Sequence, residues 1–370
     1  MAGRGDEPYA CLRHQIPRSR KGVAIDIRSK VVHSPVPPTA VRFSLFGRGP
    51  VWRNCHGLIL LACIGFFTSP SNGQSNPQRL TVASYNVQFL LDVFDDPYSI
   101  DEEHRPKSWP AIEKIAQVIR QMNPDVAVFQ EIENEGVLKA MVVEMLGGMG
   151  YEHVTVMPTN SVRGQNLGMI SRRPILGVKS HRFLKLTLPD KGRTWHFARD
   201  LMCVRIQATE NHAIDIFVAH FKSKRSTEED PQSNQWRLAE ARATRRLIGE
   251  SLSSRQPGKA NVNAVGHPTE PRWVLLLGDL NDSPGSATHR ALVERMPDPW
   301  PPLVDVHAKL PTSKRVTFLR RPFRGTIDYI LADPDLVRRL VPGSARVIDQ
   351  ANLLDASDHA PVVVSFDLRD

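Results

Sequence analysis

From residue 79 onward the sequence repeats one pattern, in which a short apolar, β-branched run ends in one or two polar residues. The segment WVLLLGDLNDSP at 273–284 is the clearest case, because its apolar run stops at Gly278 and Asp279, Asn281 and Asp282 follow at once. Runs of this length and composition are typical of buried β-strands. On this pattern, strands are expected at 79–86, 125–131, 153–157, 166–171, 200–208, 213–220, 273–279, 326–333 and 361–368.

Longer amphipathic segments between these runs predict helices. The segment 108–123 has Pro110 in its first turn and a regularly spaced apolar face. Helices are also expected through 137–150 and at 236–252, and 253–271 has the composition of a polar surface loop. Many strands and few helices, without strict alternation, indicate an α/β (α+β) fold in which two mixed β-sheets pack face to face with helices outside.

The charge of the chain is unevenly distributed. The net charge is +9, but residues 1–73 hold 10 Lys and Arg and 3 Asp and Glu, which leaves 38 basic and 36 acidic residues in 74–370. A net charge of only +2 in the folded part does not by itself indicate a nucleic-acid partner.

The first 73 residues resemble a leader. Their apolar run, HGLILLACIGFF at 56–67, is too short to span a bilayer, follows two arginines and precedes a polar stretch, as in a secretory signal peptide. We therefore expect a signal-like segment at about 51–73, a catalytic domain at 74–370, no transmembrane anchor, and a secreted or periplasmic protein. The alternatives are a lipoprotein anchored at Cys63, translation beginning near Val51, and a disordered tail with a hydrophobic anchor. Cys203 is the only cysteine in 74–370, which excludes a disulfide within that region.

Polar side chains recur where the expected strands end. Active sites of α/β proteins commonly lie at such ends, because rigid strands there support the surrounding loops. If these ends converge, they form a cleft of carboxylates, amides and two imidazoles. The residues concerned are Asn86, Glu131, His220, Asp279, Asn281, Asp328, Asp358 and His359.

An aspartate after a strand more often belongs to a turn or a helix cap than to an active site. On that basis Asp282 is expected to cap the helix that follows it, and Asp305, Asp333 and Asp335 are expected to be loop acids without a role. The recurrence at six strand ends is what favours a site.

The donor types indicate a class of chemistry. Carboxylate and amide oxygens without cysteine favour Mg²⁺, or Mn²⁺ as the alternative, over zinc. Such a cation neutralises a phosphodiester, and a histidine transfers protons near neutral pH. The combination predicts hydrolysis of a phosphate ester.

Six short motifs, in order, resemble those of the endonuclease/exonuclease/phosphatase superfamily, which has the DNase I-like fold. They are YNVQFL, VFQEIEN, AHFKSK, GDLNDSP, IDYIL and SDHAPV, and the resemblance covers about 79–368. The segment HFKSK is similar to that of secreted bacterial nucleases of this group. The resemblance implies a four-layer sandwich, with two packed mixed β-sheets flanked by helices.

The resemblance also implies roles for individual residues. Glu131 would be the principal metal ligand with Asn86 beside it, and Asp279 and Asn281 would orient the attacking water and the scissile phosphate. His359 would act as base or phosphate ligand. Asp328 would position His359, and Asp358 would support the metal or that histidine.

A second histidine, His220, would stabilise or protonate the leaving oxygen. In DNase-type members this histidine has an acidic partner upstream, whereas the comparable stretch here offers only Gln165 and Asn166. Asn166 is expected to bond a phosphate or the ring, and Arg163 to contact phosphate against the alternative of a solvated loop arginine. Lys222 alternates with His220 and is expected to face the cleft.

Members of the superfamily act on different phosphate esters, so the substrate is left open. The segment KSKR at 222–225 and the arginine-rich stretch at 237–246 favour a nucleic acid, and the acidic segment 92–104 opposes one. No exposed apolar hairpin that would enter a membrane is evident, and a small soluble ester is a further alternative. A catalytically silent binding module and a metal-binding structural protein are the non-enzymatic alternatives. The sequence implies no stable protein partner and predicts a monomer.

Overall fold

The computed structural model describes residues 78–94, 100, 104–187, 194–225, 230–254, 271–350 and 352–369. All of them fall within the unit Leu45–Asp370. The predicted leader 1–73, with its signal-like segment and Cys63, lies outside the described residues, as does most of the predicted loop 253–271. Within the described ranges, no helix has both the length and the apolar character needed to cross a bilayer.

The described residues form two six-stranded mixed sheets. The first has the order β11 (Arg346–Val347), β12 (Val362–Asp367), β1 (Arg79–Leu90), β2 (Val126–Ile132), β4 (Asn166–Ser171) and β3 (His153–Met157). The second has the order β5 (Ile175–Lys179), β6 (Leu201–Gln207), β7 (Ala213–His220), β8 (Pro271–Asp279), β10 (Asp328–Ala332) and β9 (Val304–Asp305). The pairs β1·β2 and β7·β8 are parallel, and the other neighbours are antiparallel.

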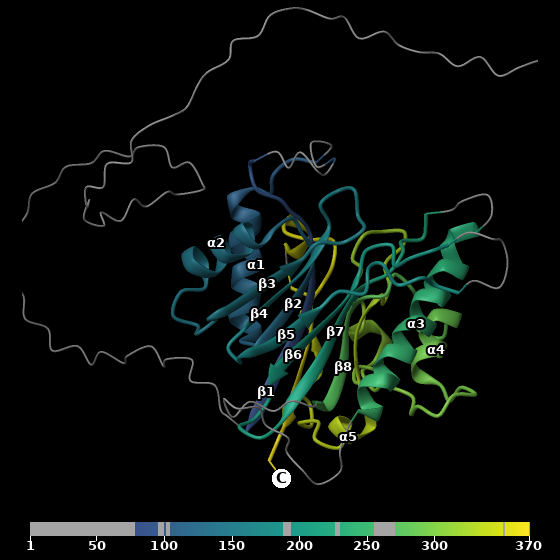
Figure 1. The fold of residues 1–370 in the computed structure, drawn as a ribbon. Helices are drawn as coiled ribbons and strands as arrows, with labels where there is room; N and C mark the ends of the chain where they lie inside the picture. Colours follow the sequence, from purple (N-terminus) through teal and green to yellow (C-terminus); the bar gives the residue numbers. More distant parts are fainter. Residues whose placement is uncertain are drawn as a thin grey trace, which may run out of the picture. The chain divides into compact units, whose positions relative to one another are not determined.

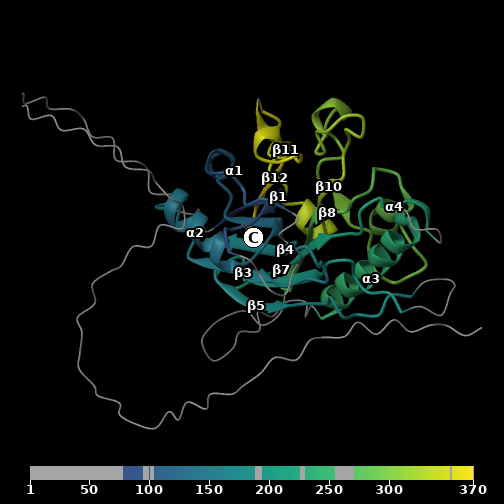
Figure 2. The same cartoon turned by 90° about the horizontal axis from the view of Figure 1, so that it is seen from above.

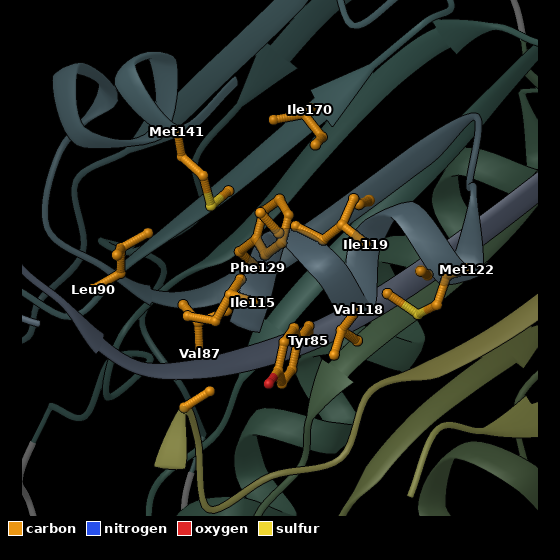
Figure 3. Packing of buried hydrophobic residues seen from close by; sticks show 14 of the residues in the cluster. Tyr85, Val87, Leu90, Ile115, Val118, Ile119, Met122, Phe129, Met141 and Ile170 are labelled. Carbon is orange, nitrogen blue, oxygen red and sulfur yellow. The ribbon is translucent and has the colours of Figure 1, made fainter. Parts of the chain in front are cut away.

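Side chains alternate along each strand, so the two faces of a sheet enter different cores. On β1, Leu80 and Val82 pack between the two sheets, against residues such as Ile216 and Leu275. Tyr85 and Val87, on the opposite face, enter an outer core beneath the helices (Figure 3). Since both faces are covered, the central strands read as nearly continuous apolar runs.

Helices cover the outer face of each sheet (Figures 1 and 2). The helices α1 (Trp109–Met122) and α2 (Glu135–Met145) pack on the first sheet, and Figure 3 shows Ile115 and Ile119 of α1 close to Phe129 of β2. The helices α3 (Asn234–Ser253) and α4 (Ala287–Val293) pack on the second sheet. The shorter elements are α5 (Pro334–Val337) and the 3₁₀ turns Pro231–Ser233, Thr312–Lys314 and Leu353–Asp355. The predicted four-layer sandwich is confirmed.

The ends of some helices, and several short elements, differ from the predictions. The helix predicted through 137–150 begins at Glu135, because Asn134 caps it by accepting a hydrogen bond from the Val137 amide, and it ends at Met145 before the glycines. The pattern did not predict β5, β9, β11 or α5, which are short, and the helix expected after Asp282 is α4.

Two predictions about aspartates are wrong. Ser286 caps α4 and accepts from the His289 amide, whereas Asp282 pairs with the buried Arg237, at 3.2 Å, and with Lys224, at 3.4 Å. Asp333 is no idle loop acid either. It caps α5 and accepts a 2.7 Å hydrogen bond from the Val274 amide, which ties β8 to the end of β10.

Candidate active site

Strand register brings the predicted residues of the second sheet together. In the parallel pair β7·β8, His220 lies opposite Asp279, and in the antiparallel pair β8·β10 Asp328 lies opposite the same Asp279. On the first sheet, Asn86 of β1 pairs beside Gln130, so that Glu131 follows at the same end of β2. The sheets pack face to face, and the two sets of strand ends therefore meet.

A glycine permits the close approach on which this register depends. Gly278 has a φ of 139°, and a Cβ there would lie 1.9 Å from the backbone oxygen of Ala219 on β7. Any other residue would push β7 and β8 apart one position before His220 and Asp279. The apolar run in WVLLLGDLNDSP thus anchors β8 in the core, and Gly278, which has no side chain, lets β7 pack close to it.

Asp279 is at the centre of the cluster and is buried. Its Oδ2 accepts hydrogen bonds from the Nδ2 atoms of Asn86, at 3.3 Å, and Asn281, at 3.1 Å, and its Oδ1 accepts from the Asn281 amide at 2.8 Å. The Nε2 atoms of His220 and His359 lie 3.5 and 4.0 Å from Oδ2. All four neighbours therefore converge on one carboxylate.

The charges around Asp279 shift its protonation. Burial, followed by the nearby carboxylate of Asp328, raises the pKa of Asp279 to about 7, although His359 and the Asn281 amide oppose the rise.

Two residues of the cluster have unusual backbone conformations: Asn281 has a φ of 52° and Glu131 a φ of 66°. Two non-glycine residues in the left-handed region within one cluster mark backbone that the surrounding structure holds in place.

Asp328 and His359 form a buried pair. The Asp328 Oδ2 lies 2.9 Å from the His359 Nδ1, and the His359 amide donates to Ser357 Oγ. Burial alone would lower the pKa of His359, but Asp328 first, and then Asp279 and Asp358, outweigh it and raise that pKa to about 10. The predicted positioning of His359 by Asp328 agrees with this geometry.

His220 has a different environment. Its Nε2 lies 3.5 Å from Asp279 and 3.9 Å from Glu131 Oε1, and its Nδ1 is buried with no hydrogen-bond partner among the described residues. Burial, and then the positive charge of Arg199, lowers its pKa well below the ordinary 6.5. His220 is therefore neutral at pH 7.

Gln165, which stands where an acid was sought, organises arginines instead. Its Oε1 accepts from Arg163 Nη2 at 3.0 Å and from Arg199 Nη2 at 3.2 Å. Arg199 is almost fully buried, and its Nη1 also donates to the Phe221 carbonyl at 3.2 Å. Burial lowers the pKa of Arg199, while Glu131 first among its acidic neighbours opposes that change. Arg199 was not predicted, since nothing in its local pattern signals a buried guanidinium.

The remaining carboxylates, Glu131 and Asp358, have a lysine nearby, Lys107, which was not predicted. Glu131 accepts a hydrogen bond from the Phe89 amide at 3.1 Å, and Asp358 pairs with Arg320 at 3.2 Å. Lys107, just before α1, donates to a backbone carbonyl. Burial lowers its pKa to about 8, and Glu131 and Asp358 oppose that change. Lys107 therefore lies within electrostatic reach of both acids.

Two predicted substrate contacts have different surroundings. The Asn166 side chain is occupied by backbone groups, because its Oδ1 accepts from the Thr159 amide and its Nδ2 donates to the Glu133 carbonyl. Lys222 lines a cavity of about 900 Å³ together with Arg163 and Arg199, and none of the predicted carboxylates or histidines is among the described residues that line it.

Two arginines of the arginine-rich helix α3 are buried in ion pairs and do not contribute to this surface. Arg237 is fully buried against Asp282, and Arg245 is buried against Asp298 at 2.6 Å. These two guanidiniums hold α3 to the neighbouring loops.

The donor set suits a hard divalent cation. Glu131, Asp279 and Asp328 are buried together, Asp328 Oδ1 has no hydrogen-bond partner in the described part of the chain, and the Asn86 amide lies between Glu131 and Asp279. Ligand atoms of Asp279, Asp328 and His359 lie within 4.8 Å of one another. Crowded buried carboxylates without a thiolate are the ligands that Mg²⁺ or Mn²⁺ takes in proteins.

Two packed mixed sheets with this cluster at their common edge define the DNase I-like class of metal-dependent phosphoester hydrolases. The model of the Endonuclease/Exonuclease/phosphatase family matches residues 81–297. The chain belongs to that family, which confirms the resemblance drawn from the six motifs.

Solved structures share the fold at low sequence identity. Truncated Caenorhabditis elegans TDP2 is 15% identical, with a TM-score of 0.50, and covers 78% of this chain and 98% of its own. The human nocturnin catalytic domain with bound sulfate anion is 15% identical, with a TM-score of 0.51, over 78% and 94%. An endonuclease/exonuclease/phosphatase from Beutenbergia cavernae is 18% identical, with a TM-score of 0.50, over 79% and 72%. No curated protein matches this chain.

Proposed function

We propose that this protein is a Mg²⁺-dependent nuclease, with Mn²⁺ as the alternative cation, that cleaves phosphodiester bonds of DNA or RNA by attack of water. The observation that carries the proposal is the convergence on Asp279 of two amides and two imidazoles, beside buried arginine and glutamate side chains. Such a set can hold a cation, a water molecule and a phosphate at once.

Glu131 and Asn86 are the proposed cation ligands, with Asp358 in support. When bound, a divalent cation neutralises the phosphate and polarises its phosphorus–oxygen bonds. Asp279, whose pKa is raised to about 7 by burial and by Asp328, accepts the proton of the attacking water. Asn281 holds the Asp279 carboxylate through two hydrogen bonds and orients the water and the phosphate.

The two histidines have distinct proposed roles because their protonation states differ. His359, held by Asp328 at 2.9 Å, carries a positive charge at neutral pH and contacts a phosphoryl oxygen. Its high pKa makes it a phosphate ligand in preference to a base. His220 is neutral and, as the second histidine, stabilises the leaving oxygen from the other side of Asp279.

Cationic side chains beside this centre support a polyanionic substrate. Arg163 and Arg199 share the Gln165 oxygen and line a cavity with Lys222. Guanidinium pairs bind phosphate oxygens with defined geometry, and lysine adds a point charge.

The test is turnover by the full chain of plasmid DNA, RNA, sphingomyelin vesicles, an inositol phosphate and bis-p-nitrophenyl phosphate, each with Mg²⁺, Mn²⁺ or chelator. We expect cation-dependent cleavage of nucleic acid, and its loss in Glu131→Ala and in His359→Ala with the far-UV circular dichroism retained. Cleavage that survives either substitution refutes the assignment. Turnover of a lipid or small ester without nucleic acid supports the alternative phosphatase or phosphodiesterase, and binding without turnover supports a silent module.

A further inference from the structure

Two phenylalanine side chains near the site are exposed. Phe183 is 72% exposed and Phe323 is 78% exposed, although large apolar side chains are usually buried. Phe323 lies in a hairpin at 317–326, and its single exposed ring stands among arginines, so this is not the apolar hairpin that would enter a membrane. Both rings have arginine neighbours in the chain: Arg182 beside Phe183, and Arg321 and Arg324 around Phe323.

The two rings flank the catalytic centre. The second sheet runs β5, β6, β7, β8, β10, and the strands β5 to β8 follow one another in Figure 1. The centre lies at the ends of β7, β8 and β10. Phe183 follows β5, on one side of the centre, and the hairpin 317–326 leads into β10, on the other.

On the β5 side, Phe183 lines the cavity of about 900 Å³ that also contains Arg199 and Lys222. Its aromatic wall includes Trp195 and Trp236, whose ring centroids are 4.4 Å apart at an edge-to-face angle of 68°. The Lys222 Nζ lies 5.0 Å from the Trp236 ring centroid. We call this cavity the aromatic pocket. Aromatic rings beside cations form the surface that binds unpaired bases and their phosphates.

On the β10 side, the hairpin 317–326 is fixed to the catalytic centre. Phe318 and Gly325 exchange two backbone hydrogen bonds, of 2.8 and 3.0 Å, which close the hairpin. The Phe318 ring lies 5.2 Å from the His359 ring, and Arg320 pairs with Asp358 at 3.2 Å. We call it the arginine hairpin, since it holds Arg320, Arg321 and Arg324 and no acidic residue.

We propose that the substrate is a single-stranded nucleic acid that crosses the catalytic centre from the aromatic pocket to the arginine hairpin, with bases stacked on Phe183 and Phe323. This inference rests on the proposed nuclease function and specifies that its substrate is single-stranded. A duplex keeps its bases paired and stacked inside, where neither ring reaches them. Because contacts lie on both sides of the scissile phosphate, the strand needs no free end, and cleavage is internal.

The composition of both surfaces favours a nucleic acid over a lipid layer. Each surface presents one exposed phenylalanine among arginines, and insertion into a membrane needs a larger apolar area. Stacking requires a flat ring, whereas burial in lipid requires only apolar area. The two substitutions Phe→Leu and Phe→Trp therefore separate the two cases.

The experiment uses the full chain with circular single-stranded DNA, a relaxed closed duplex circle of the same sequence, and bis-p-nitrophenyl phosphate. We expect the single-stranded circle to be cut at least tenfold faster than the duplex. Phe183→Leu and Phe323→Leu should each lower kcat/KM on the single-stranded circle about fivefold to a hundredfold, the range of one lost base stack. Phe183→Trp and Phe323→Trp should retain it. Turnover of bis-p-nitrophenyl phosphate should be unchanged in all four.

The matched control is Val143→Ala, which alters a side chain that is 75% exposed on α2 and should change neither activity. Equal cutting of duplex and single strand, failure to cut a circle, or full activity in the leucine variants overturns the proposal. Turnover of sphingomyelin vesicles that the leucine variants retain also overturns it. If the wild-type chain hydrolyses none of the three substrates, the proposed nuclease function itself fails.

Discussion

Replacing Asp328 by asparagine tests the buried pair with His359. The substitution keeps the volume of the side chain but removes the charge that lies 2.9 Å from His359 Nδ1. An amide that turns its nitrogen toward Nδ1 also favours the wrong ring tautomer, with the proton on Nε2. We therefore expect losses of both stability and activity.

The size of the stability loss follows from the pKa of His359. That pKa is about 10 in the folded protein, against an ordinary 6.5. One pKa unit corresponds to about 1.4 kcal/mol, so the carboxylates around the ring contribute on the order of 4–5 kcal/mol, of which Asp328, the strongest of them, should carry about 3 kcal/mol. Because the folded pKa lies above the unfolded one, this contribution is fully present below pH 6.5 and is lost as the pH rises through 10.

The assay is urea unfolding of the full chain in chelator at pH 6.5 and pH 9.5. Asp328→Asn should lose about 3 kcal/mol of unfolding free energy at the lower pH and much less at the higher one. Hydrolysis of bis-p-nitrophenyl phosphate with Mg²⁺ should fall by about 10²- to 10⁴-fold.

The control is Glu294→Gln, which removes an exposed carboxylate near Arg290 and should change stability by less than about 0.5 kcal/mol. A double-mutant cycle with His359→Ala isolates the coupling between the two side chains. A loss that is the same at both pH values, or effects that add in the cycle, would refute the reasoning.

The other predictions concern stability and cation binding. Gly278→Ala places a Cβ 1.9 Å from the Ala219 oxygen and should lower the unfolding free energy in urea by about 3 kcal/mol or more. The control is Gly177→Ala, where a Cβ would have no atom within 4 Å, and it should leave stability unchanged. Equal effects of the two substitutions would contradict the packing argument. Mg²⁺ at about 100 times its Kd should raise the unfolding free energy by about 2.7 kcal/mol, and Glu131→Ala should abolish the rise; an undiminished rise in this variant would remove Glu131 from the proposed site. Burial disfavours the charged carboxylate of Asp200 and raises its pKa from 3.8 to about 6. The unfolding free energy should therefore be higher by on the order of 3 kcal/mol below pH 4, and this extra stability is lost as the pH rises through 6. Asp200→Asn should remove that pH dependence, which titrated urea unfolding of both proteins measures.

The long strands and helices were predictable because their patterns are local. The runs that became β1, β2, β7, β8 and β12 are buried on both faces, and such strands are continuously apolar whatever lies beside them. The strand β5 escaped prediction because its residues are half-buried or exposed and include Gly177, which leaves no clear period. The strands β9 and β11, with two residues each, are too short to leave a pattern.

The sequence by itself determined which residue types could form the site, since Asn86, Glu131, His220 and Asp279 follow apolar runs and His359 stands just before one. Only the tertiary structure decided that they meet. Asn86 and Asp279, which share a hydrogen bond, are 193 positions apart in the chain. Such a contact depends on strand order and register, which no local pattern encodes.

Tertiary structure also decided the charges around the site. Arg199, just before β6, is buried where Gln165, just before β4, accepts its hydrogen bond, and Lys107 faces the carboxylates because of where α1 begins. Phe323 is exposed within the hairpin that the backbone pairing of Phe318 with Gly325 closes. For Arg199 and Lys107 the neighbours come from distant segments, and the environment that sets their burial and pKa exists only once those segments have packed.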